Sequence, residues 1–328
     1  MSKISVIVPV YNVEKWIERC ARSLFEQTLD DIEYIFVDDC STDNSIHVLK
    51  NIANEYPERE SNIKYLHHKK NTGQSGARRD GMAIATGDYI IHCDADDWVD
   101  VDMYESMYQK AVESNADAVV CDILLEMYDS TKCLNYNAKY EDHRLMYDCI
   151  APISVEYCSM CNRLISRKIF ESHSILPFEG VNMWDDVGLA IRLRFYIRDT
   201  KVISKPYYHY NRMNEHSTTK RPALGRVMEQ VECVKKLEQF FIKEKEFGKY
   251  ERFLAYLKIV AKESLLEINP KLWITTFPEA KKYIYSLRMH FPKVLWIKYL
   301  LLSYCKNIGI VTWEFCSRLF GVYKKIKI

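Results

Sequence analysis

The first third of the chain alternates short apolar, β-branched runs with stretches of helical periodicity, and this alternation limits the possible folds more than any other feature. Residues 4–8 and 32–37 are runs typical of strands buried on both faces. Helical spacing follows over 14–27 and 43–56. Such alternation builds a parallel sheet with right-handed crossovers, so the sequence predicts a doubly wound α/β domain. Further strands are expected over 63–67, 88–93 and 117–125, and further helices over 76–85, 102–116 and 187–196. Residues 126–150 are expected to be irregular, residues 158–172 to carry a strand and a short helix, and residues 180–186 to form a loop rich in Gly, Asn, Trp and Asp.

A polar cluster follows each of the first four expected strands. The clusters occupy residues 9–12, 38–43, 71–79 and 94–97. In a sheet of this kind, ligands bind beyond the carboxyl ends of the strands, near the switch in strand order. The four clusters are therefore expected to converge at one edge of the sheet. This convergence indicates a binding site more specifically than any single cluster does.

The fourth cluster is the run Cys-Asp-Ala-Asp-Asp at 93–97, which ends an apolar strand expected over 89–93. Strand alternation would send Asp94 and Asp96 to the same side. Two carboxylates so placed suit Mg²⁺ or Mn²⁺, which takes one or two protein carboxylates and completes its shell with substrate phosphates and water. A solvated acidic turn is the alternative for an isolated Asp-x-Asp, and the other clusters favour the metal site.

Five sequence motifs follow one another along the chain: Ile-Val-Pro-Val-Tyr-Asn (7–12), Val-Asp-Asp-Cys-Ser-Thr-Asp (37–43), Asn71 with Gly-Ala-Arg-Arg (76–79), Cys-Asp-Ala-Asp-Asp (93–97) and Trp-Asp-Asp-Val (184–187). In this order they resemble the family-2 inverting glycosyltransferases of the GT-A fold, over about residues 3–220. The resemblance predicts a GT-A nucleotide-sugar domain over 1–220 and a basic, aromatic-rich helical extension over 221–328. It implies transfer of a sugar from a nucleotide-diphosphate donor, UDP-linked, to a hydroxyl of a saccharide or lipid-linked saccharide in surface polysaccharide assembly.

The resemblance assigns donor binding to residues of the first three motifs. It places Pro9 and Tyr11 around the nucleotide base, although a strand-ending Pro and a packing Tyr are the structural alternatives. Asp39 would accept a hydrogen bond from the imide N–H of the base. Arg78 would contact the nucleotide or its phosphates, as suits a guanidinium fork. The family usually has Ala-Arg-Asn where this chain has Arg79 as the third residue, so which arginine faces the site stays open.

The resemblance also implies a metal, Mn²⁺ or Mg²⁺, that clamps the donor's diphosphate and neutralises charge as the glycosidic bond breaks. Asp96 would be its direct ligand, and Asp94 would bind the ribose or support the metal. A histidine after the catalytic base completes the metal shell in several GT-A enzymes. His216 is the better candidate and His209 the weaker, with an ordinary loop histidine as the alternative.

Trp184-Asp185-Asp186 stands where the family usually has Glu-Asp. By the resemblance Asp186 is the catalytic base that takes the acceptor's proton, a task that suits an ionised carboxylate. Trp184 and Asp185 would contact the acceptor. An Asp before an apolar helix is often an N-cap, and this is the alternative for Asp186 taken alone. The whole set of motifs favours the base.

The net charge of +1 hides a strong asymmetry along the chain. Residues 1–220 hold 25 Lys and Arg against 35 Asp and Glu, whereas residues 221–328 hold 21 against 10. Residues 293–328 carry seven basic residues and one acid among interleaved aromatics. This segment fits an anionic membrane surface, or a helical extension that packs on protein. A nucleic-acid partner is not expected, because no recognition motif accompanies the basic stretch.

Eleven scattered cysteines without framework spacing favour reduced thiols in a cytoplasmic protein. If the basic segment binds a membrane, the protein would be peripheral at the inner face of the cell membrane. No signal peptide or spanning segment is expected. Two other functions remain open. A sugar-nucleotide nucleotidyltransferase would want a Gly-rich phosphate loop after the first strand. A catalytically inactive membrane-bound scaffold would be indicated by loss of Asp96 or Asp186, and both are present.

Overall fold

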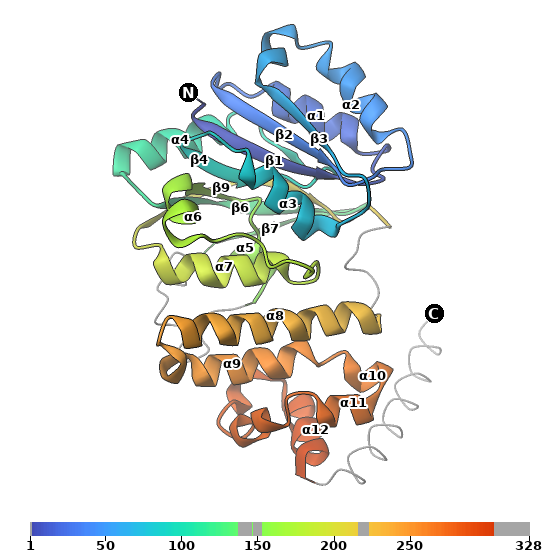
Figure 1. Cartoon of the computed structure of the whole chain (residues 1–328), viewed down its shortest axis with the longest axis vertical. Helices are drawn as coiled ribbons and strands as arrows, with labels where there is room; N and C mark the ends of the chain where they lie inside the picture. Colours follow the sequence, from blue (N-terminus) through green and yellow to red (C-terminus); the bar gives the residue numbers. More distant parts are fainter. Residues whose placement is uncertain (1, 137–145, 147–152, 216–222, 305–328) are drawn as a thin grey trace. The chain divides into compact units, whose positions relative to one another are not determined.

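A computed structural model describes residues 2–136, 146, 153–215 and 223–304. They fall into two compact units, one within 1–143 and 152–220 and the other within 144–151 and 221–328. The first unit holds the sheet and the helices that cover it, and the second consists of helices (Figure 1).

A nine-stranded sheet forms the centre of the first unit, and its first four strands run parallel (Figure 1). Their order in the sheet is β3-β2-β1-β4, with β1 paired to both β2 and β4. The carboxyl ends of these strands lie at one edge, as the alternating sequence pattern predicts. The strands are β1 (Ile4–Val10), β2 (Ile32–Asp38), β3 (Ile63–His67) and β4 (Tyr89–His92).

The sheet continues through strands of both directions. β8 (Arg163–Ser166) runs antiparallel to β4 and to β6 (Ala118–Glu126). β9 (Thr200–Asn211) runs parallel to β6 along the whole of that strand. The short strands β5 (Trp98–Val99) and β7 (Thr131–Leu134) pair antiparallel with β9 and β6. The longest ladders, β1 with β2 and β6 with β9, are parallel, so the sheet is mostly parallel.

β5, β7 and β9 are not among the strands that the sequence predicts. Lys205 and Pro206 interrupt the apolar alternation of β9, and the ladder shifts register where Asp122 pairs with Pro206. β7 lies in the segment 126–150, which the sequence predicts to be irregular. Most of β7 is exposed, so it carries no buried face for a pattern to reveal.

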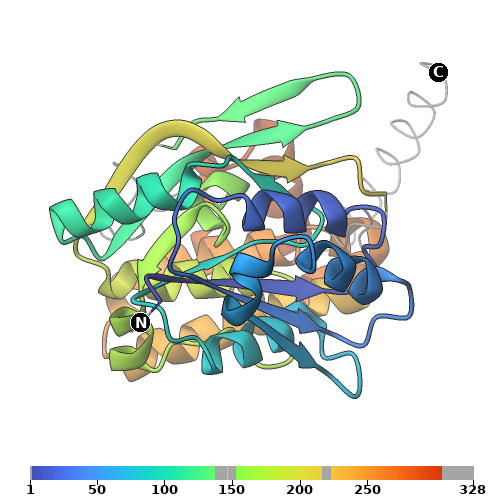
Figure 2. The ribbon, with the colours of Figure 1, turned by 90° about the horizontal axis from the view of Figure 1, so that it is seen from above.

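Helices cover both faces of the parallel strands, because alternate side chains of each strand point to opposite faces. Val6 and Val8 of β1 belong to the large core under α1, α2 and α4. Val37 of β2 packs with Ala77 of α3 on the other face (Figures 1 and 2). The helices of this unit are α1 (Ile17–Phe25), α2 (Ser45–Ala53), α3 (Gly73–Ala83), α4 (Met103–Ser114), α5 (Val155–Cys158), α6 (Arg167–His173) and α7 (Asp185–Tyr196), with a 3₁₀ turn, η1 (Pro57–Asn62).

The second unit is helical, and prolines begin or precede its shorter elements. Pro270 and Pro278 stand at the first helical positions, where a missing N–H costs nothing. None of the helices in the described part of the chain combines the length and the apolar character that crossing a membrane requires. The elements are α8 (Leu224–Lys243), α9 (Phe247–Ala261), α10 (Leu265–Ile268), α11 (Pro270–Thr275), η4 (Pro278–Tyr283), η5 (Arg288–His290) and α12 (Lys293–Tyr304).

The close packing of α3 on the sheet can be tested at Gly81. A Cβ atom there would lie 2.6 Å from Cγ2 of Ile7 and 3.2 Å from Cγ2 of Val37. Both neighbours are β-branched and buried, so they have little freedom to move. We expect Gly81→Val to lower the free energy of unfolding by about 2–3 kcal/mol, measured by urea denaturation.

Gly225→Val is the matched control, because a Cβ at this helical glycine meets nothing within 4 Å. We expect it to change the free energy of unfolding by less than about 0.5 kcal/mol. Equal effects of the two substitutions would show that α3 does not pack as closely as described.

Candidate functional site

Backbone and side-chain hydrogen bonds join the ends of β1 and β2. The N–H of Asp39 donates to the Val10 carbonyl at 2.9 Å, and the N–H of Thr42 donates to Oδ1 of Asn12 at 2.8 Å. Pro9 lies at the end of β1, beyond the last residue that pairs with β4, so its missing N–H breaks no bond to that strand. Tyr11 follows the strand with its side chain 48% exposed, so its ring is accessible at this edge.

The Asp39 carboxylate holds the loop that leads from β3 into α3. Oδ1 accepts from the N–H of Thr72 at 2.7 Å, from the Thr72 hydroxyl at 2.9 Å and lies 2.8 Å from Nδ1 of His68. Oδ2 accepts from the N–H of Gly73 at 2.7 Å. A carboxylate offers about four acceptor positions, two on each oxygen. Oδ2 is therefore the oxygen of Asp39 with capacity for a ligand.

The carboxylates of the fourth motif lie in a turn, and not on the strand. The sequence predicts a strand through Cys93, but β4 ends at His92. The N–H of Asp97 donates to the Asp94 carbonyl at 3.0 Å and closes the turn. The prediction that strand alternation brings Asp94 and Asp96 together is therefore wrong. The turn brings these two residues together instead.

Asp96 has an environment that disfavours its ionised form. Burial, and then the negative charge of Asp94, raise the pKa of Asp96 to about 6. Nδ2 of Asn214 donates to Oδ2 of Asp96 at 2.8 Å. A bound cation would offset both effects, so this carboxylate fits a metal ligand.

The Asp97 carboxylate binds β9. Its Oδ1 accepts from the N–H of Asn211 at 2.7 Å, and its Oδ2 accepts from the Tyr208 hydroxyl. The Tyr208 hydroxyl also accepts from the N–H of Asp94 at 3.3 Å. Asp97 therefore anchors the turn to the sheet. The sequence did not reveal these partners, because they depend on the pairing of β5 with β9.

Arg78 of α3 connects the Asp94 turn to the start of α7. Its Nη2 lies 2.8 Å from Oδ1 of Asp94, and its Nη1 lies 2.6 Å from Oδ2 of Asp185. The Arg78 side chain is 3% exposed and that of Asp185 is 5% exposed. Arg79, the other arginine of the motif, donates to the Pro177 carbonyl at 2.9 Å. Arg78 is thus the arginine that faces the carboxylates.

The start of α7 carries the two acids of the fifth motif. Trp184 precedes the helix with φ of 67°, a left-handed conformation that is uncommon for a residue other than glycine. Asp186 is the second helical residue, and its Oδ1 accepts from the N–H of Val187 at 2.8 Å. Burial, and then the charge of Asp185, raise the pKa of Asp186 to about 7. Asp186 therefore holds a proton more readily than an ordinary carboxylate does.

Two amide side chains that no motif singled out complete the connections. Nε2 of Gln74 donates to Oδ1 of Asp94 at 2.8 Å. Oδ1 of Asn182 accepts from both the N–H and the hydroxyl of Ser75 at 3.1 Å, which ties the loop before α7 to the start of α3. The segment Gly180–Asp186 was expected to be a polar loop, but nothing in its composition indicated the partner of Asn182. Hydrogen bonds therefore link all five motifs at one edge of the sheet.

Of the two histidines that the sequence offers as metal ligands, His209 lies within the described residues. His209 lies between Glu126 and Asp100, with Nδ1 2.7 Å from Oε1 of Glu126 and Nε2 3.0 Å from Oδ1 of Asp100. Both ring nitrogens are occupied, so His209 is not placed to bind a metal. His216 lies outside the described residues. Within the described ranges, no three His, Cys, Asp or Glu side chains are grouped to hold a metal ion.

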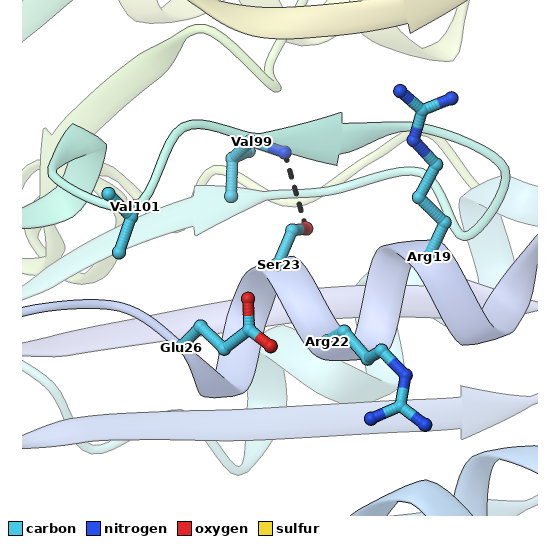
Figure 3. Close-up of a pocket in the computed structure, with 6 residues that line it drawn as sticks. All are labelled: Arg19, Arg22, Ser23, Glu26, Val99 and Val101. Atoms are coloured by element: carbon cyan, nitrogen blue, oxygen red, sulfur yellow. Dashed lines mark hydrogen bonds between the residues drawn. The ribbon is translucent and has the colours of Figure 1, made fainter.

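A separate shallow hollow of about 240 Å³ lies between α1 and the β5 strand (Figure 3). One of its arginines is already paired: Arg22 lies 3.0 Å from Glu18 and 2.7 Å from Glu55, whereas Arg19 stacks over the ring of Trp98. The Ser23 hydroxyl accepts from the N–H of Val99 at 3.3 Å. This hollow contains no residue of the five motifs, so the candidate site is the carboxylate edge. Its lining residues are Arg19, Arg22, Ser23, Glu26, Val99 and Val101.

Comparison with known proteins identifies both fold and family. The described structure is similar to Staphylococcus aureus TarS 1–349 in complex with UDP-GlcNAc, with a TM-score of 0.67, 18% identity and 97% and 92% of the two chains covered. It is also similar to the mannosyltransferase PcManGT from Pyrobaculum calidifontis in complex with GDP-Man and Mn²⁺, with a TM-score of 0.50, 16% identity and 98% and 88% covered. These similarities confirm the predicted GT-A fold, with a helical C-terminal region.

The sequence is 40% identical over 229 residues to the uncharacterized glycosyltransferase EpsJ of Bacillus subtilis, covering 67% of this chain and 63% of EpsJ. The chain thus spans less than two thirds of that relative's length. The family model described as glycosyl transferase family 2 matches residues 5–174. The resemblance drawn from the five motifs is confirmed, and the chain belongs to glycosyl transferase family 2.

Proposed function

We propose that this chain transfers a sugar, with inversion, from a nucleotide-diphosphate donor to a hydroxyl of a saccharide or lipid-linked saccharide acceptor. The observation that carries the proposal is the Arg78 bridge, which connects the Asp94 turn to the helix that bears Asp186. The bridge joins the turn that we propose to bind the metal to the helix whose Asp186 we propose as the base, in a family-2 domain. We propose a UDP-linked donor, because TarS has been solved with UDP and with UDP-GlcNAc.

On the donor side, Tyr11 and Pro9 would receive the base, and Oδ2 of Asp39 would accept from its imide N–H. Tyr11 is exposed and offers a flat face for stacking. Arg78 is buried and paired, so we assign it an indirect role: it fixes Asp94 and leaves direct contact with the nucleotide to other residues.

Asp96 and Asp94 would hold Mn²⁺ or Mg²⁺. Two carboxylates suit an ion that keeps positions for phosphate oxygens and water. Gln74 and Arg78 both bind Oδ1 of Asp94, and within the described residues Oδ2 accepts no hydrogen bond. When bound, such an ion neutralises the negative charge that develops on the leaving diphosphate. PcManGT has been solved with Mn²⁺, which supports this choice of cofactor.

On the acceptor side, Asp186 would act as the general base. Its carboxylate would take the proton of the acceptor hydroxyl as that oxygen attacks the anomeric carbon on the face opposite the diphosphate. Trp184, held in a left-handed conformation beside it, would contact the acceptor. Asp185 is buried against Arg78, so we propose that it orients the start of α7 and meets an acceptor only if that ion pair opens.

The pathway is proposed from relatives alone. A poly(ribitol-phosphate) beta-glucosyltransferase of Bacillus spizizenii is 38% identical over 117 residues. We therefore place the acceptor among surface polysaccharides. Neither a nucleotidyltransferase nor an inactive scaffold is favoured by any observation at the site.

The metal assignment predicts that Asp96→Ala abolishes the gain in UDP affinity that Mn²⁺ provides. The ion would lose its main protein ligand, and isothermal titration with and without Mn²⁺ measures the change. Asp30→Ala is the control, because that side chain is 93% exposed and its one ion pair with the described residues is a 3.9 Å contact with Arg59. Retention of the metal-dependent gain in folded Asp96→Ala would refute the assignment.

The base assignment predicts that Asp186→Asn binds UDP as the parent protein does but turns over about 10²-fold or more slowly. The amide keeps the size of the side chain and can still accept from the N–H of Val187, but it cannot take a proton. Single-turnover transfer or donor hydrolysis measures the rate. A rate near that of the parent would restrict Asp186 to a structural role in the first turn of α7, where it accepts from the N–H of Val187.

The raised pKa of Asp186 predicts the pH dependence of the reaction. Below about pH 7 the carboxylate is increasingly protonated and cannot act as a base. We therefore expect kcat/KM to rise with pH up to about 7 and then to level. The residual rate of Asp186→Asn should lack this rise, and a parent profile that is flat across this range would contradict the role.

A further inference from the structure

The helical unit exposes an unusual number of large apolar side chains near its C-terminal end. Tyr285, Met289, Val294, Ile297 and Tyr304 are 67%, 82%, 61%, 41% and 60% exposed. They are five of the sixteen large hydrophobic residues that are exposed in the described part of the chain, yet they lie within twenty positions. Surface apolar residues are normal when scattered, whereas a concentration of them marks an interaction site.

These side chains belong to one packed substructure. On α12, Val294, Ile297 and Tyr304 recur at spacings of three and seven, which puts them on one helix face. Tyr299 and Leu302 of the same helix are completely buried. One face of α12 is therefore buried and the other is exposed, although most residues of the helix are apolar. The described residues leave the second apolar face uncovered.

Two hydrogen bonds hold α12 against the preceding turns. Nε1 of Trp296 donates to the Ile284 carbonyl at 2.9 Å, and the Tyr304 hydroxyl donates to the Lys281 carbonyl at 3.2 Å. The ring of Tyr285 lies 6.1 Å from that of Trp296. We call the exposed side chains of residues 281–304 the apolar–basic surface.

The charge of this segment is of one sign. Residues 280–304 contain five Lys and Arg and no Asp or Glu. Lys282 pairs with Glu251 at 2.8 Å, whereas Arg288 and Lys293 are exposed and form no ion pair with the described residues. In the sequence, residues 305–328 add five more basic residues and one acid. Uncompensated positive charge beside exposed apolar side chains is the combination that an anionic bilayer interface binds.

We infer that the apolar–basic surface binds this protein to an anionic membrane. The exposed aliphatic side chains would enter the interface, the tyrosine rings would sit at the headgroups, and the basic side chains would pair with anionic lipid. A second copy of the chain fits less well, because two such surfaces would bring like charges together. This inference goes beyond the proposed transfer reaction and does not depend on it.

The test is co-sedimentation of the full chain with phosphatidylcholine vesicles, with and without phosphatidylglycerol. We expect binding only to the anionic vesicles, weakening as salt is added, since exposed charges are screened beyond about 10 Å at 0.1 M. The double variant Arg288→Glu with Lys293→Glu should lower the partition at least about tenfold. Failure of the parent chain to bind anionic vesicles would overturn the inference.

The matched control is Ile242→Ser with Lys243→Glu at the end of α8, where Ile242 is 57% exposed. It removes one exposed apolar residue and reverses one charge in the same unit, and it should bind as the parent does. The variant Val294→Ser with Ile297→Ser should bind less at every salt concentration. Melting curves check that each variant is folded. If the apolar variant unfolds, the charge variant still tests the inference, because it alters only exposed side chains.

Sedimentation velocity without vesicles tests the alternative that a second copy of the chain binds this surface. We expect no dimer that the Val294→Ser with Ile297→Ser variant dissociates. Such a dimer would assign this surface to contact between two copies of the chain and contradict membrane binding. Equal vesicle binding by the charge variant and the control would also overturn the inference, because the membrane would then be bound elsewhere on the chain.

Discussion

The buried guanidinium of Arg78 is the interaction on which the candidate site depends. A buried cation is stable only when it is paired, and Arg78 pairs with one carboxylate from each of two loops. Removing one partner of such a pair typically costs about 3–5 kcal/mol, because the other charge stays buried. A single side chain of α3 therefore connects the Asp94 turn directly to the start of α7.

The surrounding carboxylates differ in their partners. Asp185 and Asp94 are paired with Arg78. Asp96 and Asp186 lie outside that pairing, and burial together with neighbouring acids raises the pKa of Asp96 to about 6 and that of Asp186 to about 7. Groups of one chemical type thus receive separate tasks from their environments. In the proposed reaction, a cation would stabilise the ionised form of Asp96, and Asp186 would exchange a proton near neutral pH.

The parallel half of the fold could be predicted because its signals are local. Buried strands such as 4–8 read as continuous apolar runs, and the polar residues after them mark the binding edge. β9 could not be predicted, since Lys205 and Pro206 disrupt its pattern and its place is set by pairing with β6. The same holds for the site: its motifs were recognisable, but the contacts of Asn182, Gln74 and Tyr208 arise from packing between distant segments.

The structure gives some residues a role that differs from the one expected from the sequence. Arg78 was expected to touch the donor, and it lies buried between two acids instead. The sequence shows a guanidinium beside a binding edge but not which carboxylates come within its reach, because Asp185 is 107 positions away. Asp39 likewise serves the loop before α3 with most of its acceptor capacity.

A crystal structure of the chain with UDP and Mn²⁺ would test the central claim most directly. We predict anomalous manganese density at the Asp96 carboxylate, the diphosphate bound to the same ion, and the base beside Tyr11 with Oδ2 of Asp39 at its imide. A nucleotide bound elsewhere, or a diphosphate at this edge with no ion at Asp96, would contradict the account.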